Sequence, residues 1–409
     1  MRVIVIGAGF TGACTAWMLR EHLDADVTIL ERSDVPGGML RTLHTVDGVA
    51  YEYGPRVVSA FRGTPDAIDF VRRFVKLEPR DVYQGTRLLP EYPVIPFPVD
   101  LESLGQLPCG AQIRAELADI RAARVPPREA NLREYLESSV GPTLTELAFE
   151  GFNQKFWGRR LEDMPATWGK LRRLERVATT GDYRLPSVAP HYYPAGGFSP
   201  LFDGLLGEVP VEYGVVAERI ERNGTTSSVV TNHGRFTADL VVATGPIDEM
   251  LDLRFGPLEW RGYRIETEVV AAGNGPSLGA APDGVPFAWI YTPWSSTPVA
   301  RTTDFGVIHH GYGPSAAREP FVVLREIVDD SVRMYPVWWE DERFNRYLEA
   351  ATAIPGLVPL GRLGLYKYVT IDTTYEMVLR LVQHLDRFCA ADATERFEVM
   401  RVVRGDWDN

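Results

Sequence analysis

The chain has 409 residues, of which 45% are hydrophobic, and its formal net charge at pH 7 is −12. This length predicts two or three domains, and the hydrophobic share is sufficient for packed cores. The acidic balance disfavours a broad surface for nucleic acid or for anionic membranes, whereas a local basic pocket for a small anion is compatible with it.

Three features of the sequence indicate whether the protein binds a metal ion and in which cellular compartment it lies: its cysteines, its histidines and its apolar runs. The three cysteines, Cys14, Cys109 and Cys389, are widely separated and indicate neither a disulfide framework nor a zinc site. The seven histidines lack the spacing of a metal centre, and no apolar stretch approaches the about 20 residues of a membrane span. The chain begins almost directly in an apolar run, which leaves no room for a signal peptide. We therefore expect a cytoplasmic protein without a metal ion.

The first 38 residues carry a dinucleotide-binding pattern. A β-branched run breaks at Gly7 into G-x-G-x-x-G, a helical pattern follows, and a second apolar run ends at Glu31. The glycines allow a tight turn and close approach of the backbone to a pyrophosphate, and the carboxylate suits the ribose hydroxyls. The alternative is a glycine-rich turn without a ligand. The residues expected at the cofactor are Gly7, Gly9, Phe10, Thr11, Gly12, Glu31, Arg32, Gly38 and Met39.

Two further features favour FAD over NAD. The segment 31–38 resembles the extended fingerprint of FAD-binding oxidases and mutases, with its acidic residue, arginine and paired glycines. Residues 216–244 predict a hairpin around Asn223-Gly224 and then a buried strand that ends in Ala-Thr-Gly. That strand resembles the one that closes over the cofactor in two-dinucleotide flavoproteins, although an ordinary buried strand has the same pattern.

The rest of the chain predicts two inserts. Residues 79–99 read as irregular, 101–170 as mostly helical, and 255–310 as strands, while the tail carries one helix over 375–388. We expect an α/β fold in which a Rossmann-like FAD-binding domain bears a helical insert domain and an antiparallel-sheet insert domain. The expected boundaries are 1–78, 197–252 and 340–409 for the first, 100–170 for the second, and 79–99, 171–196 and 253–339 for the third.

Four stretches resemble motifs of the UDP-galactopyranose mutases. Residues 244–268 are similar to T-G-P-I-D…R-F-G-x-L-E-[YW]-R, and residues 361–368 are similar to G-R-L-x-x-Y-K-Y. Residues 156–166 and 193–198 are similar to W-G-R…L-P-A and P-x-G-G-[YF]. The matches keep their order and span nearly the whole chain, so the chain is identified as a divergent member of this family.

The resemblance implies an unusual use of flavin. In this family N5 of the reduced flavin attacks the anomeric carbon of a nucleotide sugar and expels the nucleotide diphosphate. The adduct opens as an iminium and the sugar recloses, so that pyranose becomes furanose without net redox change. This implies FAD, a nucleotide-diphosphate sugar, and NAD(P)H or another reductant for activation, and it allows a homodimer. The chemistry needs cations at the leaving group and a pocket that excludes water.

The family motifs also imply roles for single residues. Arginine suits a diphosphate because its fork donates two parallel hydrogen bonds. The resemblance places Arg362 by the flavin, Tyr368 and Tyr335 on the diphosphate, Trp157 on the uracil side, and Arg172 and Tyr183 on a substrate loop. Arg362 and Tyr368 are expected to act in catalysis. A core position for Trp157 and a solvated helix face for Arg172 are the alternatives.

Three departures from the family pattern concern the sugar. Arg56 stands where the family has a histidine, Trp289 where it has an arginine, and Thr370 where it has an aspartate. We expect Arg56 to supply charge for catalysis, and Trp289 and Thr370 to face the substrate. The changed residues predict a sugar other than that of UDP-galactose, from secondary metabolism.

Two other functions remain open on the same fold, because fold does not fix function. One is an FAD-dependent oxidoreductase of the amine-oxidase type. The other is a catalytically silent homologue that binds a nucleotide sugar, which the missing histidine and arginine suggest.

Overall fold

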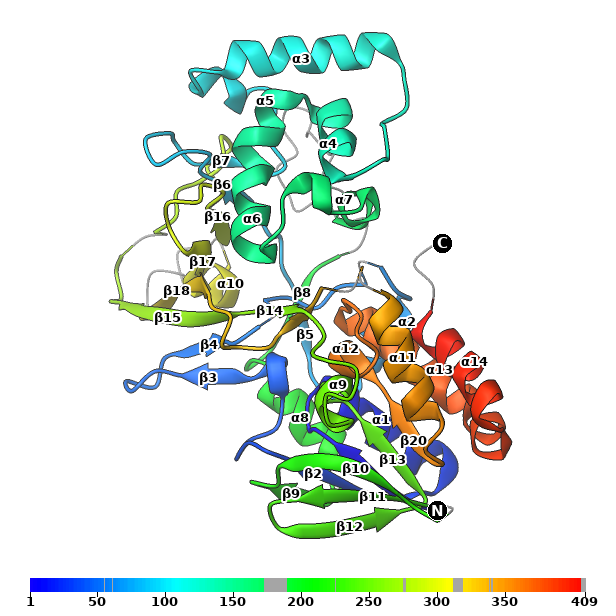
Figure 1. Ribbon diagram of the computed structural model, residues 1–409. Helices are drawn as coiled ribbons and strands as arrows, with labels where there is room; N and C mark the ends of the chain where they lie inside the picture. The colour runs from blue at the N-terminus through cyan, green and yellow to red at the C-terminus, as the bar shows by residue number, and fades with distance from the viewer. Residues whose placement is uncertain are drawn as a thin grey trace.

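The computed structural model describes the chain except for residues 55, 61, 173–189, 225, 275–276, 312–318, 338, 340 and 406–409. Figure 1 shows an elongated molecule with a parallel sheet near the N-terminus at one end and helices α3 to α7 at the other. A mixed sheet lies between them. The predicted α/β class, with a helical and a sheet insert, is therefore confirmed, while the predicted domain boundaries stay predictions.

A five-stranded parallel sheet forms one end of the molecule. Its strand order is β20-β13-β1-β2-β9, and all four pairings are parallel. Strands buried on both faces read as continuous apolar runs, as in the segment Arg-Val-Ile-Val-Ile of β1. The strands are β1 (Arg2–Ile6), β2 (Asp26–Glu31), β9 (Val211–Tyr213), β13 (Leu240–Ala243) and β20 (Leu357–Pro359).

Helices and a small sheet cover this parallel sheet. Helix α1 (Phe10–Leu23) packs against α8 (Ser199–Leu206) and α13 (Ile371–Ala390). In the small antiparallel sheet of β10, β11 and β12, strand β12 contacts β1 and strand β11 contacts β13. The hairpin predicted at Asn223-Gly224 is present, because Asn223 pairs with Thr226. The three antiparallel strands are β10 (Ala217–Asn223), β11 (Thr226–Thr231) and β12 (Gly234–Ala238).

The C-terminal tail corrects one prediction. Only one helix was predicted there, over 375–388, whereas α13 begins at Ile371 and a second helix, α14 (Ala393–Arg404), follows it. Asp392 caps the second helix, since its side chain accepts a hydrogen bond from the Glu395 amide at 2.9 Å. An aspartate three residues before a glutamate indicates a helix start, so the sequence does carry a signal for this second helix.

The mixed sheet has the strand order β15-β18-β17-β16-β6-β7. All of its pairings are antiparallel except that of β16 with β6, which is parallel. The segment 79–99, predicted as irregular, supplies two of these strands. The six strands are β6 (Gln84–Thr86), β7 (Ile95–Pro96), β15 (Tyr263–Val270), β16 (Trp289–Tyr291), β17 (Val299–Asp304) and β18 (Phe321–Val328).

The helical part surrounds a second apolar core, which also takes in Tyr263 and Tyr335 from the strands. A single π-helical turn, Glu146–Glu150, joins two of its helices. The helices are α3 (Gly110–Ala123), α4 (Leu132–Val140), α5 (Pro142–Thr145), α6 (Gly151–Trp157) and α7 (Ala166–Arg172). Every described helix of the protein is too short or too polar to span a lipid bilayer.

The remaining described elements lie outside the two large sheets and the helical part, and most of them are short. The helices among them are α2 (Asp66–Arg72), α9 (Ile247–Met250), α10 (Phe305–His310), α11 (Asp341–Thr352) and α12 (Gly361–Gly364), and 3-10 turns cover Gly38–Leu40, Ser103–Gln106 and Leu161–Asp163. The strands are β3 (Thr42–His44), β4 (Ala50–Glu52), β5 (Leu77–Pro79), β8 (Tyr192–Pro194), β14 (Trp260–Arg261) and β19 (Tyr335–Pro336).

Candidate active site

The glycine motif forms a tight loop at the carboxyl end of β1. Gly7 has a φ of +100°, which favours glycine, and a Cβ on Gly12 would lie 1.9 Å from the carbonyl oxygen of Gly7. The Gly37 amide donates to the Ala8 carbonyl at 2.9 Å, and Gly9 forms an isolated bridge with Gly37. The two glycine-rich segments predicted to contact the cofactor therefore lie side by side.

The start of α1 fits the diphosphate of a dinucleotide. Gly9 precedes the helix without any side-chain cap, and the first turn contains no acidic residue. The free amides and the positive end of the helix dipole are thus open to an anion. Phe10 is buried behind this turn and Arg32 is exposed. Glu31 ends β2 and accepts hydrogen bonds from the amides of Ala8 at 2.7 Å and Ser33 at 2.8 Å.

Arg362 lies next to these loops. A Cβ on Gly361 would come within 2.7 Å of Thr11 Oγ1, so α12 is pressed against the start of α1. Arg362 donates through Nη1 to Met39 Sδ at 3.0 Å and through Nη2 to the Val369 carbonyl at 2.6 Å. The predicted cofactor residues at the two glycine segments and Arg362 are therefore brought together.

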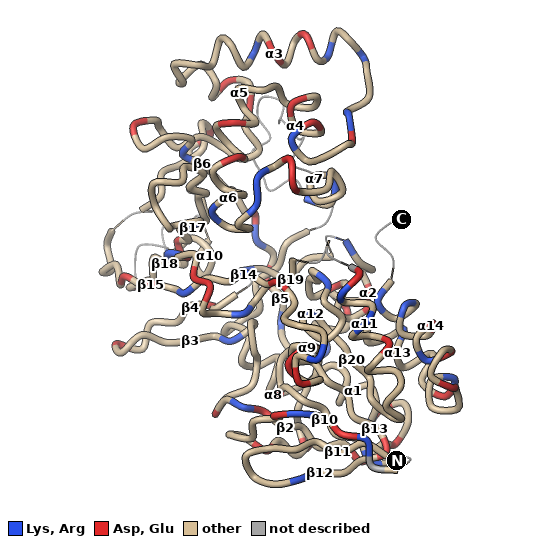
Figure 2. Tube along the Cα trace, in the orientation of Figure 1, with Lys and Arg blue, Asp and Glu red and all other residues tan. Residues whose placement is uncertain are grey.

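Beside Arg362 lies a group of side chains that we name the tyrosine–arginine cluster: Tyr335, Tyr368, Arg62, Arg172 and Arg362. The two tyrosine rings stack, with centroids 5.8 Å apart and planes inclined by 20°. The guanidinium carbons of Arg62, Arg172 and Arg362 lie 5.3, 5.7 and 5.3 Å from the centroid of Tyr368. Arg172 also donates to the Tyr368 hydroxyl at 3.3 Å. Charged residues of both signs are interspersed along the fold (Figure 2). At the Tyr368 ring, three arginines meet.

The arginines change the acidity of this phenol. Burial opposes ionisation of Tyr368, but four guanidinium groups outweigh burial and lower its pKa to about 8. Those groups belong to Arg172, Arg362, Arg62 and Arg301. The stacked Tyr335 behaves differently, because burial raises its pKa. The cluster thus stabilises negative charge at the Tyr368 position.

Three tryptophan side chains, Trp157, Trp168 and Trp339, pack together beside the tyrosine–arginine cluster. Trp157 is 2% exposed, and its ring centroid lies 4.9 Å from Trp168, 5.6 Å from Trp339 and 6.3 Å from Tyr335. Trp157 is therefore packed as a core residue beside the predicted diphosphate site, and a role in substrate binding stays a prediction. Trp168 and Trp339 were not predicted as site residues, because no motif separates them from ordinary core aromatics.

Arg56 forms a buried ion pair with Glu326. Arg56 is 3% exposed and donates to Glu326 Oε1 at 2.7 Å and to Thr303 Oγ1 at 3.3 Å. Arg301 donates to both oxygens of the same carboxylate, at 2.8 and 2.6 Å. Burial raises the pKa of Glu326, but the two guanidiniums together hold it below its ordinary value. The three side chains therefore carry one net positive charge, and Arg56 shares its only carboxylate partner among the described residues with Arg301.

The other two departures from the family pattern also have partners. Trp289 is 5% exposed, donates its indole N–H to Gln84 Oε1 at 3.0 Å, and lies 5.9 Å from the guanidinium of Arg301. Thr370 caps α13 in a reciprocal capping box with Thr373 and donates to Asp372. Tyr183 lies outside the described residues.

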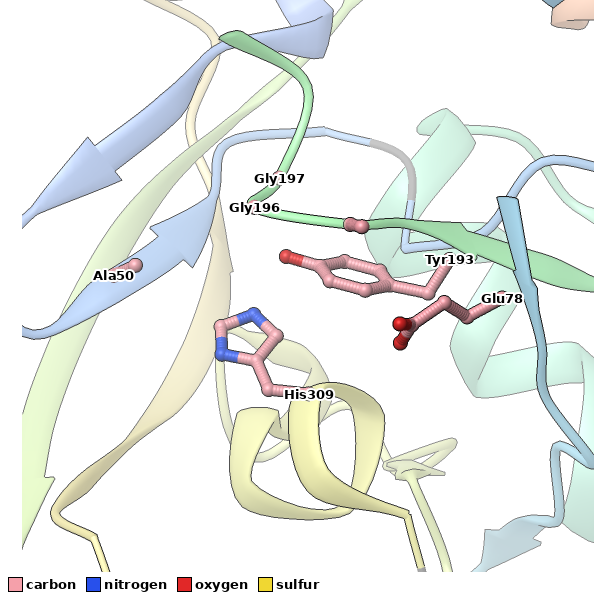
Figure 3. Close-up of a pocket in the computed structure, with 7 residues that line it drawn as sticks. Ala50, Glu78, Tyr193, Gly196, Gly197 and His309 are labelled. Carbon is pink, nitrogen blue, oxygen red and sulfur yellow. The ribbon is translucent and has the colours of Figure 1, made fainter. Parts of the chain in front are cut away.

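A separate cavity of about 280 Å³ opens between β4, β5, β8 and α10 (Figure 3). The hydroxyl of Tyr193 and the imidazole of His309 face it. Both also reach the buried Glu52, since Tyr193 donates to Oε1 at 2.6 Å and His309 Nε2 lies 3.0 Å from Oε2. Glu52 is thus the hydrogen-bond partner of both Tyr193 and His309, and none of the three was predicted as a site residue. The remaining lining residues are Ala50, Glu78, Ala195, Gly196 and Gly197.

Comparisons with known proteins agree with the motifs. The family model described as UDP-galactopyranose mutase matches residues 147–368, and one described as an NAD(P)-binding Rossmann-like domain matches residues 5–74. A dTDP-fucopyranose mutase of Escherichia coli is 23% identical, with 93% of this chain and 97% of the relative covered. A UDP-galactopyranose mutase of Mycoplasma pneumoniae is 22% identical, with 93% and 95% covered.

Solved structures extend the likeness to the whole fold. The crystal structure of a reduced UDP-galactopyranose mutase superposes with a TM-score of 0.73, 17% identity and full coverage of both chains. A putrescine oxidase superposes with a TM-score of 0.57 and 13% identity, with 95% of this chain and 99% of that chain covered. The fold alone therefore does not separate a mutase from an oxidase. The family model does, because it spans more than half of the chain, so this chain belongs to the UDP-galactopyranose mutase family and is an isomerase of nucleotide sugars.

Proposed function

We propose that the protein is a flavin-dependent pyranose/furanose mutase that acts on a nucleotide sugar other than UDP-galactose. The observation that carries the proposal is the tyrosine–arginine cluster, which joins Met39 and the start of α1 through Arg362. The proposed anion site for a nucleotide diphosphate thus adjoins the proposed dinucleotide site. Such a juxtaposition suits a reaction between the cofactor and a nucleotide sugar.

The proposed cofactor is FAD, which must be reduced, by NAD(P)H or another reductant, for activity. Its diphosphate would be held at Gly7, Gly9, Gly12 and the first turn of α1, with its ribose at Glu31. When bound and reduced, the flavin supplies a nucleophilic nitrogen for the anomeric carbon of the sugar. A homodimer is compatible with the family and is not required by the site.

The cluster is the proposed site of the leaving group. Departure of a nucleotide diphosphate from the anomeric carbon develops negative charge on a phosphate oxygen, and positioned cations stabilise that charge in a water-poor site. Arg362 and Arg172 would donate to the phosphates, and the neutral hydroxyls of Tyr335 and Tyr368 would add hydrogen bonds. The same cations hold the diphosphate in place for its return to the isomerised sugar.

The sugar would face residues that offer fewer polar contacts than those of the family pattern. Trp289 presents an apolar plane, and the hydroxyl of Thr370 is used within α13 and by Asp372. The side chain of Arg56 is engaged by Glu326, a carboxylate that it shares with Arg301. Fewer polar partners favour a sugar with fewer hydroxyls. The E. coli relative is named for fucopyranose, a 6-deoxy sugar carried on dTDP, so we propose a deoxy sugar nucleotide as substrate.

A substrate panel tests this function. Dithionite-reduced protein would be incubated with UDP-galactopyranose, dTDP-fucopyranose and carboxylated nucleotide sugars, and the products separated by chromatography. We expect conversion of a deoxy sugar nucleotide to its furanose form with no reductant consumed per turnover, and poor conversion of UDP-galactopyranose. One hydride equivalent per product would indicate an oxidoreductase instead. Binding of every sugar without turnover would indicate a silent homologue.

The acidity of Tyr368 predicts a pH dependence of nucleotide binding. The phenol is neutral below its pKa of about 8 and becomes a phenolate above it. A phenolate repels a diphosphate and competes with it for the same arginines, so the dissociation constant of UDP or dTDP should rise by up to about tenfold per pH unit above pH 8. Titration calorimetry over this range measures the effect. The Tyr368→Phe variant should bind with little pH dependence, and an equally steep rise in that variant would contradict the assignment.

A further inference from the structure

Arg62 brings a third guanidinium to the tyrosine–arginine cluster from a segment that no family motif covers. Its guanidinium carbon lies as close to the Tyr368 ring as that of Arg362, 5.3 Å from the centroid in both cases. Its Nη2 donates to the carbonyl of Leu171 at 3.1 Å, next to Arg172 at the end of α7. Three guanidiniums from three separate segments therefore surround one phenol.

The backbone of Arg62 is held by Asp372 at the start of α13. The Asp372 Oδ2 atom accepts hydrogen bonds from the amides of Arg62 at 2.8 Å and Gly63 at 2.7 Å. Asp372 is fully buried, and a Cβ on Gly63 would come within 2.9 Å of the carbonyl carbon of Asp372. The segment is therefore pressed against the helix. Asp372 is the first carboxylate after Tyr368 in the sequence, and it holds the backbone of Arg62 and Gly63.

The charges in the cluster are arranged for an anion. Burial lowers the pKa of Arg62 to about 10, and repulsion by Arg172 and Arg362 adds to the effect. Like charges brought this close in a partly buried site repel, and an anion between them relieves that repulsion. Among the described residues, Arg172 and Arg362 form no ion pair with a carboxylate. A bound diphosphate ester would supply two negative charges to these groups.

Arg62 also supplies a positive charge, which this chain lacks at the position of Trp289. The family resemblance places an arginine at the position of Trp289, and the nearby Arg56 is engaged by Glu326 at 2.7 Å. Arg62 is not part of that ion pair and lies at the cluster itself. It can therefore supply a cation to the phosphates that neither Trp289 nor Arg56 provides.

We propose that Arg62 binds the diphosphate of the nucleotide sugar in place of the arginine lost at Trp289, and that Asp372 is its positioning residue. The inference rests on the proposed mutase function, since it concerns the leaving group of that reaction. It adds a diphosphate-binding residue to those that the family motifs imply.

Binding of UDP and dTDP to the flavin-loaded protein tests the role of Arg62. We expect Arg62→Met to weaken binding by about ten- to hundredfold, because it loses a charge-assisted hydrogen bond. Arg62→Lys should weaken it less, because lysine keeps the charge but lacks the planar fork. The loss should shrink at high ionic strength. Arg401→Met is the matched control, since it removes an equal charge from an exposed position on α14.

A second measurement needs no ligand and reports on position. The tyrosinate absorbance that disappears in Tyr368→Phe would be titrated from about pH 7 to about pH 9. We expect its midpoint near 8 in the wild type and in Arg401→Met, and a higher midpoint in Arg62→Met, where one stabilising cation is gone. Asp372→Ala, which removes the oxygen that accepts from the amides of Arg62 and Gly63, should also raise the midpoint and weaken UDP binding, whereas Asp372→Asn, whose amide oxygen can still accept both bonds, should do so less. A merely structural role of Asp372 would leave the midpoint unchanged.

The outcomes separate this inference from the proposed function. If Arg362→Met weakens UDP binding and Arg62→Met does not, the diphosphate site stands and the role of Arg62 is overturned. A shifted tyrosinate midpoint without any loss of affinity also overturns the binding role. If none of the arginine variants alters the affinity for UDP or dTDP, the proposed function fails, and the inference fails with it.

Discussion

Replacing Arg362 with alanine should lower kcat/KM for the nucleotide sugar by about 30- to 1,000-fold, the equivalent of about 2–4 kcal/mol of transition-state stabilisation. Arg362 lies 4.9 Å from the Tyr335 ring and 5.3 Å from the Tyr368 ring, and it contacts Met39 beside the proposed cofactor site. It is therefore placed to stabilise charge that develops as the diphosphate leaves. Steady-state kinetics with reduced protein measures the loss.

Two controls make the Arg362 result specific. The flavin content of the variant must first match that of the wild type, because Arg362 also borders the cofactor loops and a colourless variant would be inactive for another reason. Arg401→Ala, an exposed arginine on α14, should leave kcat/KM unchanged. An Arg362→Ala enzyme with full flavin content and wild-type kcat/KM would show that the family motif has been transferred wrongly.

Replacing Gly9 with valine should give a folded protein that takes up no flavin. Gly9 has extended backbone angles, φ −73° and ψ 178°, which any residue can adopt. The nearest non-local atom to a Cβ there is Gly38 Cα, at an ordinary contact distance of 3.8 Å. The protein itself therefore tolerates the Cβ, whereas a diphosphate that must approach the backbone at the start of α1 does not.

Gly12 provides the contrasting variant. A Cβ on Gly12 would lie 1.9 Å from the Gly7 carbonyl oxygen, so Gly12→Ala should lower the melting temperature of the protein even without cofactor. Visible absorbance after reconstitution with FAD, together with thermal melts of the apoproteins, distinguishes the two effects. A yellow Gly9→Val protein with stoichiometric flavin would refute this placement of the diphosphate.

Local patterns predicted three strands of the parallel sheet, β1, β2 and β13, and the helix α1, because β-branched runs and a glycine turn are visible in the sequence itself. The short strands β9 and β20 of the same sheet were not predicted. The strands β6 and β7 were missed, since their sheet forms with β16, which lies about 200 residues later. Such short strands carry no periodicity of their own and depend on their partners. Pairing with distant strands, rather than local β-strand propensity, therefore determines that β6 and β7 form.

The same limit applies to the site. Family motifs predicted Tyr335, Arg362 and Tyr368, and the structure brings these three together. The pairing of Arg56 with Glu326, 270 residues away, could not be read from the sequence. Arg62 was missed because its placement depends on a carboxylate 310 residues later in the chain. A charged residue without an evident partner in the sequence can therefore be paired, or held at a site, by a residue that only folding brings close to it.

The order of the parallel sheet has a consequence for biosynthesis. The first 74 residues contain the whole glycine fingerprint but only two of the five strands, β1 and β2. Strand β1 completes its pairing with β13, and β13 in turn pairs with β20 at residues 357–359. A nascent N-terminal fragment would expose an unpaired apolar strand edge, which invites aggregation. The chain must therefore be made at least to residue 359 before the sheet closes, and flavin capture should follow the synthesis of β20.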